Sequence, residues 1–161
     1  MLEWTQLEVA RDLTLRLVAS PSGIRAIQFD PARPLPAERN DANPVLLEAC
    51  RQLGEYFAGN LREFDLPLDM QGTEFQKCVW NRLTAIPYGC VRSYAEIAAE
   101  VGSPKAVRAV GAANGANPIP IVVPCHRVIG SSGKLVGYGG GLPLKKRLLD
   151  IEDCNRNLFM Q

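Results

Sequence analysis

The chain has 161 residues, of which 47% are hydrophobic and 22% charged, and its formal net charge is +1. This composition excludes a disordered chain and suits one compact domain, or a small domain beside a larger one. Residues 1–70 hold 7 basic and 11 acidic side chains, whereas residues 71–161 hold 11 basic and 6 acidic ones. The basic second part fits a polyanionic partner, and equally a random scatter of charge in a neutral protein.

Targeting and membrane segments are not expected. The N-terminal stretch MLEWTQLEVARD is acidic and has no apolar core, which argues against a signal peptide. The longest apolar region, residues 109–129, is interrupted by glycine, asparagine and proline, so we expect no membrane span.

The five cysteines are odd in number and form no CxxC pair: Cys50, Cys78, Cys90, Cys125 and Cys154. We therefore expect free thiols and a reducing, cytoplasmic location. Because the chain has one histidine, we expect no zinc site, and we expect no other metal or cofactor. Cys50, Cys78 and Cys154 are interpreted as small buried hydrophobes.

The first part of the chain is expected to form a small αβ domain built on a β-hairpin. Residues 13–29 alternate apolar and polar side chains around a Ser-Pro-Ser-Gly turn, which predicts two antiparallel strands. Residues 30–44 are rich in proline and predict an exposed loop. The segment 44–58 has helical spacing. Its predicted apolar face consists of Leu46, Leu47, Cys50, Leu53 and Phe57. We place a domain boundary near residue 70, so that residues 1–70 support the reactive domain 71–161.

The second part begins with a helix marked by a capping box. Thr73 is the expected N-cap and Gln76 stands three positions on, so that each side chain can bond the other residue's backbone amide. The buried stripe of this helix is expected to hold Phe75, Val79, Trp80 and Leu83.

Two shorter helices follow, and the tight turn between them predicts a helix-turn-helix. The first has a capping box of Ser93 and Glu96 and stops at Gly102. The second is expected to start with Ser103 as its N-cap, because a proline follows at the first helical position, and to run to Asn114.

The remaining segments complete the predicted fold. Residues 119–129 are expected to form a buried extended segment, residues 130–143 a glycine-rich loop, and residues 144–152 a short basic amphipathic helix. The predicted fold class is α/β of the α+β kind, in which a hairpin-based αβ domain precedes a mainly helical, winged-helix-like domain.

The second helix of the helix-turn-helix consists mainly of alanine, valine and glycine. Its small residues permit close approach to a surface, either a protein core, for which Val107 and Val110 are candidates, or a DNA groove. It offers almost no base-reading side chains, so DNA binding would show weak sequence preference and fall steeply with salt. The candidate DNA contacts are Lys105, Ala106, Arg108, Ala109 and Ala113.

The sequence Pro-Cys-His-Arg at residues 124–127 is the candidate reactive site, because it holds the sole histidine next to a cysteine. The reactive thiolate must form from a thiol of pKa about 8.5, so a base is needed. Neighbours in an extended segment point to opposite faces, so His126 requires a bridging water or a turn to act on Cys125. Glu152 is a candidate to fix the tautomer of His126. A buried, inert cysteine is the competing interpretation.

In order along residues 71–153, the motifs GTEFQKCVW, IPYG, SYAEIA, KAVRAVGAAN, NP, PCHRV, GYGGG and LLDIE resemble the O6-alkylguanine-DNA alkyltransferase family. The first 70 residues are similar to it only in general style, as in YFAGNLREFDLPLD. The resemblance implies that Cys125 accepts an alkyl group from O6 of a guanine flipped out of duplex DNA, once per molecule. It also implies that His126 takes the thiol proton through a water and that Glu152 orients His126.

The resemblance implies further roles. Tyr94 would press on the phosphate beside the target, help rotate the nucleotide and protonate the departing base, while Arg108 would fill the vacated stack in the DNA. Asn117 would brace the site, and Tyr138 would lie against the flipped base. Backbone groups at Cys125 and Val128 would read the guanine edge. The expected partner is double-stranded DNA with O6-alkylguanine, bound in the minor groove by a monomer, with cooperative binding left open.

The sequence departs from the family pattern in two places. Gly139, a candidate contact to the substrate base, stands where some relatives carry a serine. The first domain lacks the cysteine and histidine residues that bind zinc in some relatives. Other interpretations are a non-catalytic sensor of alkylated DNA, a thiol hydrolase or redox protein, and an alkylation-dependent transcription regulator.

Overall fold

The computed structural model describes residues 1–29 and 34–159, with side chains described as far as residue 153. It divides into two compact units, Met1–Gln71 and Gly72–Gln161. Within the described part of the chain, every helix is too short or too polar to cross a membrane.

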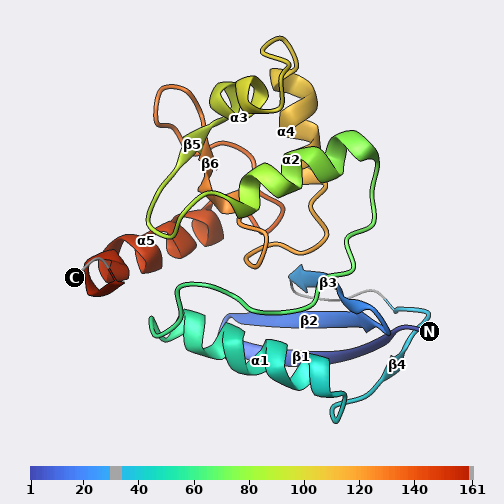
Figure 1. Cartoon of the computed structure of the whole chain (residues 1–161). Helices are drawn as coiled ribbons and strands as arrows, with labels where there is room; N and C mark the ends of the chain where they lie inside the picture. The colour runs from blue at the N-terminus through green and yellow to red at the C-terminus, as the bar shows by residue number, and fades with distance from the viewer. Residues whose placement is uncertain (30–33, 160–161) are drawn as a thin grey trace. The chain divides into compact units, whose positions relative to one another are not determined.

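The first unit is a four-stranded sheet covered by one helix (Figure 1). Its strands are β1 (Glu3–Ala10), β2 (Leu13–Ser20), β3 (Gly23–Phe29) and β4 (Glu38–Arg39), in the order β3-β2-β1-β4. The central pairs are antiparallel, and β4 lies parallel to β1. The helix α1 (Pro44–Phe57) packs against the first three strands. The predicted hairpin is confirmed as β2 and β3.

Two strands of this sheet were not expected from the sequence. β1 lies in the segment interpreted only as an acidic N-terminus, and β4 lies in the predicted proline-rich loop, of which residues 30–33 fall outside the described residues. In β1, Thr5 is buried while Gln6 and Glu8 are exposed. Such alternation is the usual sign of a half-buried strand. In β1 the alternating stretch is short and weakly apolar, so the sequence did not reveal the strand.

The helix α1 has nearly the predicted bounds, but its buried face is different. The buried residues are Leu46, Ala49, Gln52, Leu53 and Tyr56. Leu47 is 53% exposed, and Cys50 and Phe57 are only half-buried, so the predicted face is wrong at three positions. Gln52 is buried because its amide group bonds both the backbone N–H and the carbonyl of Asp65.

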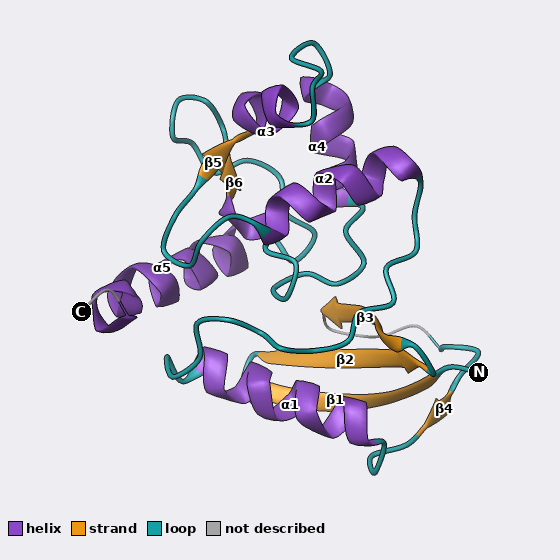
Figure 2. Cartoon of the chain, in the orientation of Figure 1, coloured by secondary structure: helices purple, strands orange, loops and turns teal. Residues whose placement is uncertain are grey.

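The second unit is mainly helical (Figure 2). Its elements are α2 (Glu74–Thr84), β5 (Arg92–Ser93), α3 (Tyr94–Glu100), α4 (Val107–Gly115), the 3-10 helix η1 (Cys125–Arg127), β6 (Val128–Ile129) and α5 (Leu142–Phe159). The helices α2, α3 and α4 pack on one another, and η1 contacts α2 and α5. The strands β5 and β6 form a small parallel pair. The predicted α+β class and its helix-turn-helix are confirmed.

Both predicted capping boxes are present, at Thr73 and at Ser93. The stripe on α2 holds Val79, Trp80 and Leu83, but Phe75 is 37% exposed, so its predicted burial is wrong.

The helix α4 begins later than predicted. The amide of Ala106 bonds the carbonyl of Ser103, so the Ser-Pro-Lys segment forms a separate turn and Ala106 becomes the N-cap. The predicted cap at Ser103 is therefore wrong. Val110 is buried as expected, whereas Val107, at the first helical position, is exposed.

Candidate active site

The Cys-His pair lies in a tight turn rather than in the predicted extended segment. The amide of Arg127 bonds the carbonyl of Pro124, and the amide of Val128 bonds the carbonyl of Cys125, which closes the 3-10 helix η1. Cys125 is 5% exposed and His126 is fully buried. His126 needs a turn or a bridging water to act on Cys125, because neighbours in an extended segment point to opposite faces. The structure supplies the turn.

The resting Cys125 thiol holds its proton. Burial raises the pKa of this thiol, because the charged thiolate loses its hydration. The Asn117 side chain, the positive charge of Lys145 and the backbone amides of Cys125 and His126 lower the pKa in part. The polar groups thus stabilise a thiolate once it forms, but a base must first remove the proton.

His126 has the arrangement of such a base. Its Nε2 lies 2.6 Å from Oε2 of Glu152, and because a carboxylate only accepts, Nε2 carries the hydrogen. Nδ1 then holds the lone pair. It is buried and has no hydrogen-bond partner among the described residues. Burial lowers the pKa of His126, although Glu152 acts in the opposite direction, so the imidazole rests neutral.

Arg127 holds the other side of Glu152. Its guanidinium places Nε 2.7 Å from Oε1 and NH2 3.1 Å from Oε2, in a buried bidentate pair. A third bond, from NH1 to the carbonyl of Ile86 at 2.7 Å, fixes the guanidinium itself. Burial would raise the pKa of Glu152, but the bonds and charges of His126 and Arg127 outweigh it and lower the pKa to about 2. Arg127 was not among the site residues predicted from the sequence.

Lys145 is fully buried, which sequence reasoning missed because it placed this residue in a basic amphipathic helix. Its Nζ donates to the carbonyl of Val128 at 2.6 Å, of Val136 at 2.9 Å and of Gly137 at 3.4 Å. Burial lowers the pKa of Lys145, and the charge of Cys125 raises it in part. The ammonium therefore ties the glycine-rich loop to the turn that carries Cys125.

Two tyrosines lie close to the sulfur. The Tyr94 hydroxyl donates to the carbonyl of Val136 at 3.2 Å, and the Nζ of Lys145 lies 6.0 Å from the centre of its ring. Burial and then the negative charge of Cys125 raise the pKa of Tyr94. The same two causes raise the pKa of Tyr138 well above its ordinary value. The fold thus brings together both tyrosines and the Cys-His-Glu set predicted from the sequence.

The segment before Cys125 is a strained turn held by Asn117. Ile121 has φ of 74°, a left-handed conformation that a β-branched residue rarely adopts. The Asn117 side chain donates from Nδ2 to the carbonyl of Val123 at 2.8 Å and accepts at Oδ1 from the amide of Ile119 at 3.0 Å. These two bonds bracket Ile121 and hold the turn that leads into the thiol.

The predicted DNA contacts fall into two groups. Lys105, Arg108 and Ala109 are exposed, and Ala106 is half-buried. Ala113 is only 2% exposed, and its carbonyl accepts a bond of 2.8 Å from Nε1 of Trp80. Ala113 therefore belongs to the contact between α4 and α2, and its prediction as a DNA contact is wrong.

The two predicted base contacts Val128 and Gly139 differ from each other in burial. Val128 is buried and its carbonyl accepts from Lys145. Gly139 is exposed, and a Cβ built there would meet no atom within 4 Å, so nothing in the fold excludes a larger residue.

The other cysteines do not all fit the prediction of buried hydrophobes. Cys78 and Cys90 are exposed free thiols, and Cys50 is a half-buried one. The prediction for Cys78 is wrong because this residue lies on the outer face of α2, away from Val79 and Trp80. The side chain of Cys154 lies outside the described residues.

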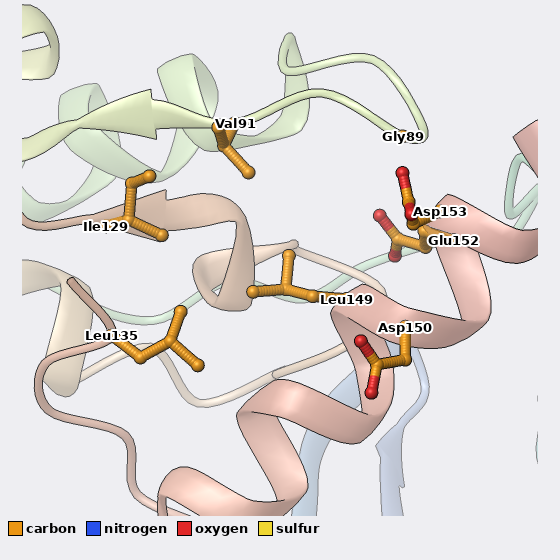
Figure 3. Close-up of a pocket in the computed structure, with 8 residues that line it drawn as sticks. All are labelled: Gly89, Val91, Ile129, Leu135, Leu149, Asp150, Glu152 and Asp153. Carbon is orange, nitrogen blue, oxygen red and sulfur yellow. The ribbon is translucent and has the colours of Figure 1, made fainter. Parts of the chain in front are cut away.

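A pocket of about 250 Å³ lies beside Glu152 (Figure 3). It is lined by Gly89, Val91, Ile129, Leu135, Leu149, Asp150, Glu152 and Asp153. Its apolar side chains come from β6, the segment before β5, the glycine-rich loop and α5, and its carboxylates come from α5. Cys125 does not line this pocket, so it is not the place where a substrate would meet the thiol.

Comparison with known proteins decides the family. Residues 74–154 match the family model for the 6-O-methylguanine DNA methyltransferase, DNA binding domain. Residues 14–70 match the model for the ribonuclease-like domain of the same methyltransferase. The chain belongs to the 6-O-methylguanine DNA methyltransferase family.

Individual members of the 6-O-methylguanine DNA methyltransferase family are similar over different lengths. A methylated-DNA–protein-cysteine methyltransferase of Mycolicibacterium paratuberculosis is 65% identical over 104 residues, which cover 65% of this chain and 63% of that protein. The protein of that name in Methanosarcina barkeri is 48% identical over 142 residues, 86% of this chain and 90% of its own length. The crystal structure of Mycobacterium tuberculosis OGT in complex with DNA superposes with a TM-score of 0.85 at 44% identity, covering 96% of this chain and 93% of that one.

Proposed function

We propose that this 6-O-methylguanine DNA methyltransferase family member repairs O6-alkylguanine, mainly O6-methylguanine, in double-stranded DNA by transferring the alkyl group to its own Cys125. The observation that carries the proposal is the buried set of Cys125, a neutral His126 with a free lone pair at Nδ1, and a Glu152 carboxylate clamped by Arg127. The names of the relatives support the same reaction, because they are methyltransferases that act from DNA to a protein cysteine.

The first step is removal of the thiol proton. His126 accepts it at Nδ1 through a bridging water, while the Nε2–H stays bonded to Glu152. The Glu152 carboxylate stabilises the imidazolium that forms, as in other sites where a third group orients the catalytic base. The positive charge of Lys145 and the nearby amides stabilise the thiolate.

In the second step, the sulfur attacks the alkyl carbon on O6. A C–S bond forms as the C–O bond breaks, and the electron pair passes to the guanine ring. Tyr94 donates its phenolic proton to the departing base, and the imidazolium of His126 returns the thiol proton to the Tyr94 phenolate through water. Guanine therefore leaves neutral, and His126 and Tyr94 end in their starting protonation states. The product is a thioether that no group in the chain cleaves, so each molecule reacts once.

Guanine in a duplex cannot present O6 to a buried thiol, so the base must leave the stack. We assign DNA binding in the minor groove to α3 and α4, with Tyr94 beside the target phosphate and Tyr138 against the flipped base. The sulfur and these phenols lie within one unit, Gly72–Gln161. We assign a supporting role to the unit Met1–Gln71. We place the protein in the cytoplasm, since its four described cysteines are free and a reducing compartment keeps them so. We propose that it acts as a monomer.

Mass spectrometry tests the proposal directly. The protein is incubated with a duplex that holds one O6-methylguanine, and the intact mass and a peptide map are taken. We expect one added methyl group, located on Cys125, in the wild type and in the control variants Cys78→Ser and Cys90→Ser, which lack exposed thiols. We expect none in Cys125→Ser. A wild-type protein that binds the lesion but stays unmodified would be a damage sensor, and the proposal would fail.

Arg108 tests the base-flipping step. This exposed residue of α4 is expected to occupy the space left in the DNA stack. Arg108→Ala should slow repair of duplex DNA roughly tenfold, because flipping costs a few kcal/mol that the inserted side chain offsets. Repair of the free base O6-methylguanine should not change. The control is Arg82→Ala, which removes another exposed positive charge, from α2. Equal losses in both variants would show a general charge effect instead.

A further inference from the structure

The pocket beside Glu152 has no role in the reaction described above, because Cys125 does not line it. Its volume of about 250 Å³ equals the share of roughly eight molecules in liquid water. Drug-sized ligands occupy pockets of about 300–1,000 Å³, so this one suits a smaller molecule, of roughly eight non-hydrogen atoms. Val91, Asp150 and Asp153 are exposed, so a ligand can reach the pocket from solvent.

One side of the pocket is apolar. Figure 3 shows four aliphatic side chains around a common space, those of Val91, Ile129, Leu135 and Leu149. They come from the segment before β5, from β6, from the glycine-rich loop and from α5. Val91 is 42% exposed and the other three are only half-buried. An apolar ligand group would remove this surface from water, which is favourable.

The other side is acidic, and its carboxylates belong to α5 (Figure 3). Glu152 is buried and its charge is balanced by Arg127. Asp150 and Asp153 are exposed, so they are the carboxylates that a ligand can reach. Asp150 pairs with Lys146 at 2.6 Å, but both side chains are more than half exposed, and such a pair is weak.

The charge of the lining determines the sign of the ligand. Three of the eight described residues that line the pocket are acidic and none of them is basic. A concave surface lined by one sign of charge attracts the opposite sign. An ammonium group also supplies three hydrogen-bond donors to carboxylate oxygens, which only accept. Phosphates and other anions are disfavoured for the same reason.

We propose that the pocket beside Glu152 binds a small organic cation, with an aliphatic body against the four apolar side chains and an ammonium group at Asp150 and Asp153. This site goes beyond the alkyl transfer proposed for Cys125 and does not depend on it.

The test uses three probes of nearly equal shape that differ in charge: cyclohexylmethylammonium, cyclohexylmethanol and cyclohexanecarboxylate. Each is titrated into the full chain without DNA, and the methyl signals of valine, isoleucine and leucine are followed by NMR. We expect the ammonium probe to shift the signals of the four lining residues with a Kd of about 1 mM, as for a ligand of this size. At low salt it should bind about fivefold more tightly than the alcohol, and high salt should reduce this ratio. The carboxylate probe should bind most weakly.

Two variants separate the apolar and the charged contributions. Val91→Trp places a large side chain in the pocket and should abolish the shifts, whereas Leu47→Trp, a change at an exposed residue of α1, should not. Replacing Asp150 and Asp153 together by asparagine should bring the ammonium probe to the affinity of the alcohol. The matched control replaces the exposed Glu8 and Glu63 together by glutamine and should keep the wild-type ratio.

Three results would overturn the inference. They are the absence of saturable shifts in the wild type, equal affinity for the ammonium and the alcohol, and shifts that persist in folded Val91→Trp. If Val91→Trp does not fold, the double aspartate variant decides. The readout involves no alkyl transfer, so a chain that binds the ammonium probe but repairs no DNA contradicts the proposed function alone.

Discussion

Replacing Glu152 by glutamine is expected to slow alkyl transfer to Cys125 by about 100-fold or more, the lower end of what a positioned general base contributes. The glutamine keeps the shape but removes the charge that stabilises the imidazolium of His126. Its amide also presents N–H groups that can oppose the donors of His126 and Arg127, which lie 2.6 Å and 2.7 Å from the carboxylate. The rate is measured in single turnover on duplex DNA with O6-methylguanine.

The same change should lower the free energy of unfolding by about 3 kcal/mol, because one partner is removed from a buried ion pair. The buried guanidinium of Arg127 then lacks its countercharge. Urea unfolding at neutral pH measures the loss. Glu63→Gln, which alters a largely exposed carboxylate, is the control and should change the free energy of unfolding by less than about 1 kcal/mol.

The pH dependence of stability gives a further check on Glu152. Its pKa is about 2 in the folded protein, below the ordinary value of 4.5. A carboxylate with a lowered folded pKa contributes stability above pH 4.5, and this contribution is lost as the pH falls towards 2. The lowered pKa of His126 acts in the same direction below pH 6.5, because the unfolded chain takes up that proton first. The wild type should therefore lose stability from about pH 6.5 downwards. If Glu152→Gln keeps the full loss below pH 4.5, another carboxylate causes it.

Local signals predicted the elements around the site well. The capping boxes at Thr73 and Ser93 depend on residues three positions apart, so sequence alone contains the whole interaction. The pairing of His126 with Glu152 was predicted from a resemblance, although 26 positions separate the two residues. The turn at residues 125–127 was missed, since a proline-rich apolar segment indicates extended backbone and only Asn117 and the strained Ile121 bend it.

Other contacts between distant elements could not be predicted from the sequence. Lys145 has the spacing of a surface lysine on an amphipathic helix, and its burial depends on three carbonyl groups in η1–β6 and the glycine-rich loop. Asn114 is of a residue type common at helix ends, and its burial depends on the packing of α4 against Cys125. Ala113 is a small residue that suits a DNA groove as well as a helix contact, and only the bond from Trp80 decides between them.

Replacing Lys145 by methionine should lower the free energy of unfolding by about 2–4 kcal/mol and raise the pKa at which Cys125 reacts. The methionine fills similar space but removes the Nζ donor from the carbonyls of Val128 and Gly137, while the carbonyl of Val136 still accepts from Tyr94. Each acceptor left without a donor costs about 1–3 kcal/mol, and the removed burial cost of the ammonium offsets part of the sum. The charge balance of the site gives the second effect. Among the described residues, Arg127 and Lys145 are the buried cations near the thiol, and Glu152 is the buried carboxylate that pairs with Arg127. A thiolate at Cys125 is the anion that balances Lys145.

The matched control is Lys146→Met, one position along α5. Its Nζ lies 2.6 Å from a carboxylate oxygen of Asp150, but both side chains are more than half exposed, so its loss should cost less than about 1 kcal/mol. Alkyl-transfer rates are measured from pH 6 to pH 10. In Lys145→Met the rate at neutral pH should fall roughly tenfold, equal to a shift of about one pKa unit, and recover as the pH rises. A variant that is less stable but keeps the wild-type pH profile would show that Lys145 only holds the loop. A shifted profile means that the fold stabilises the thiolate with a lysine charge that burial makes effective.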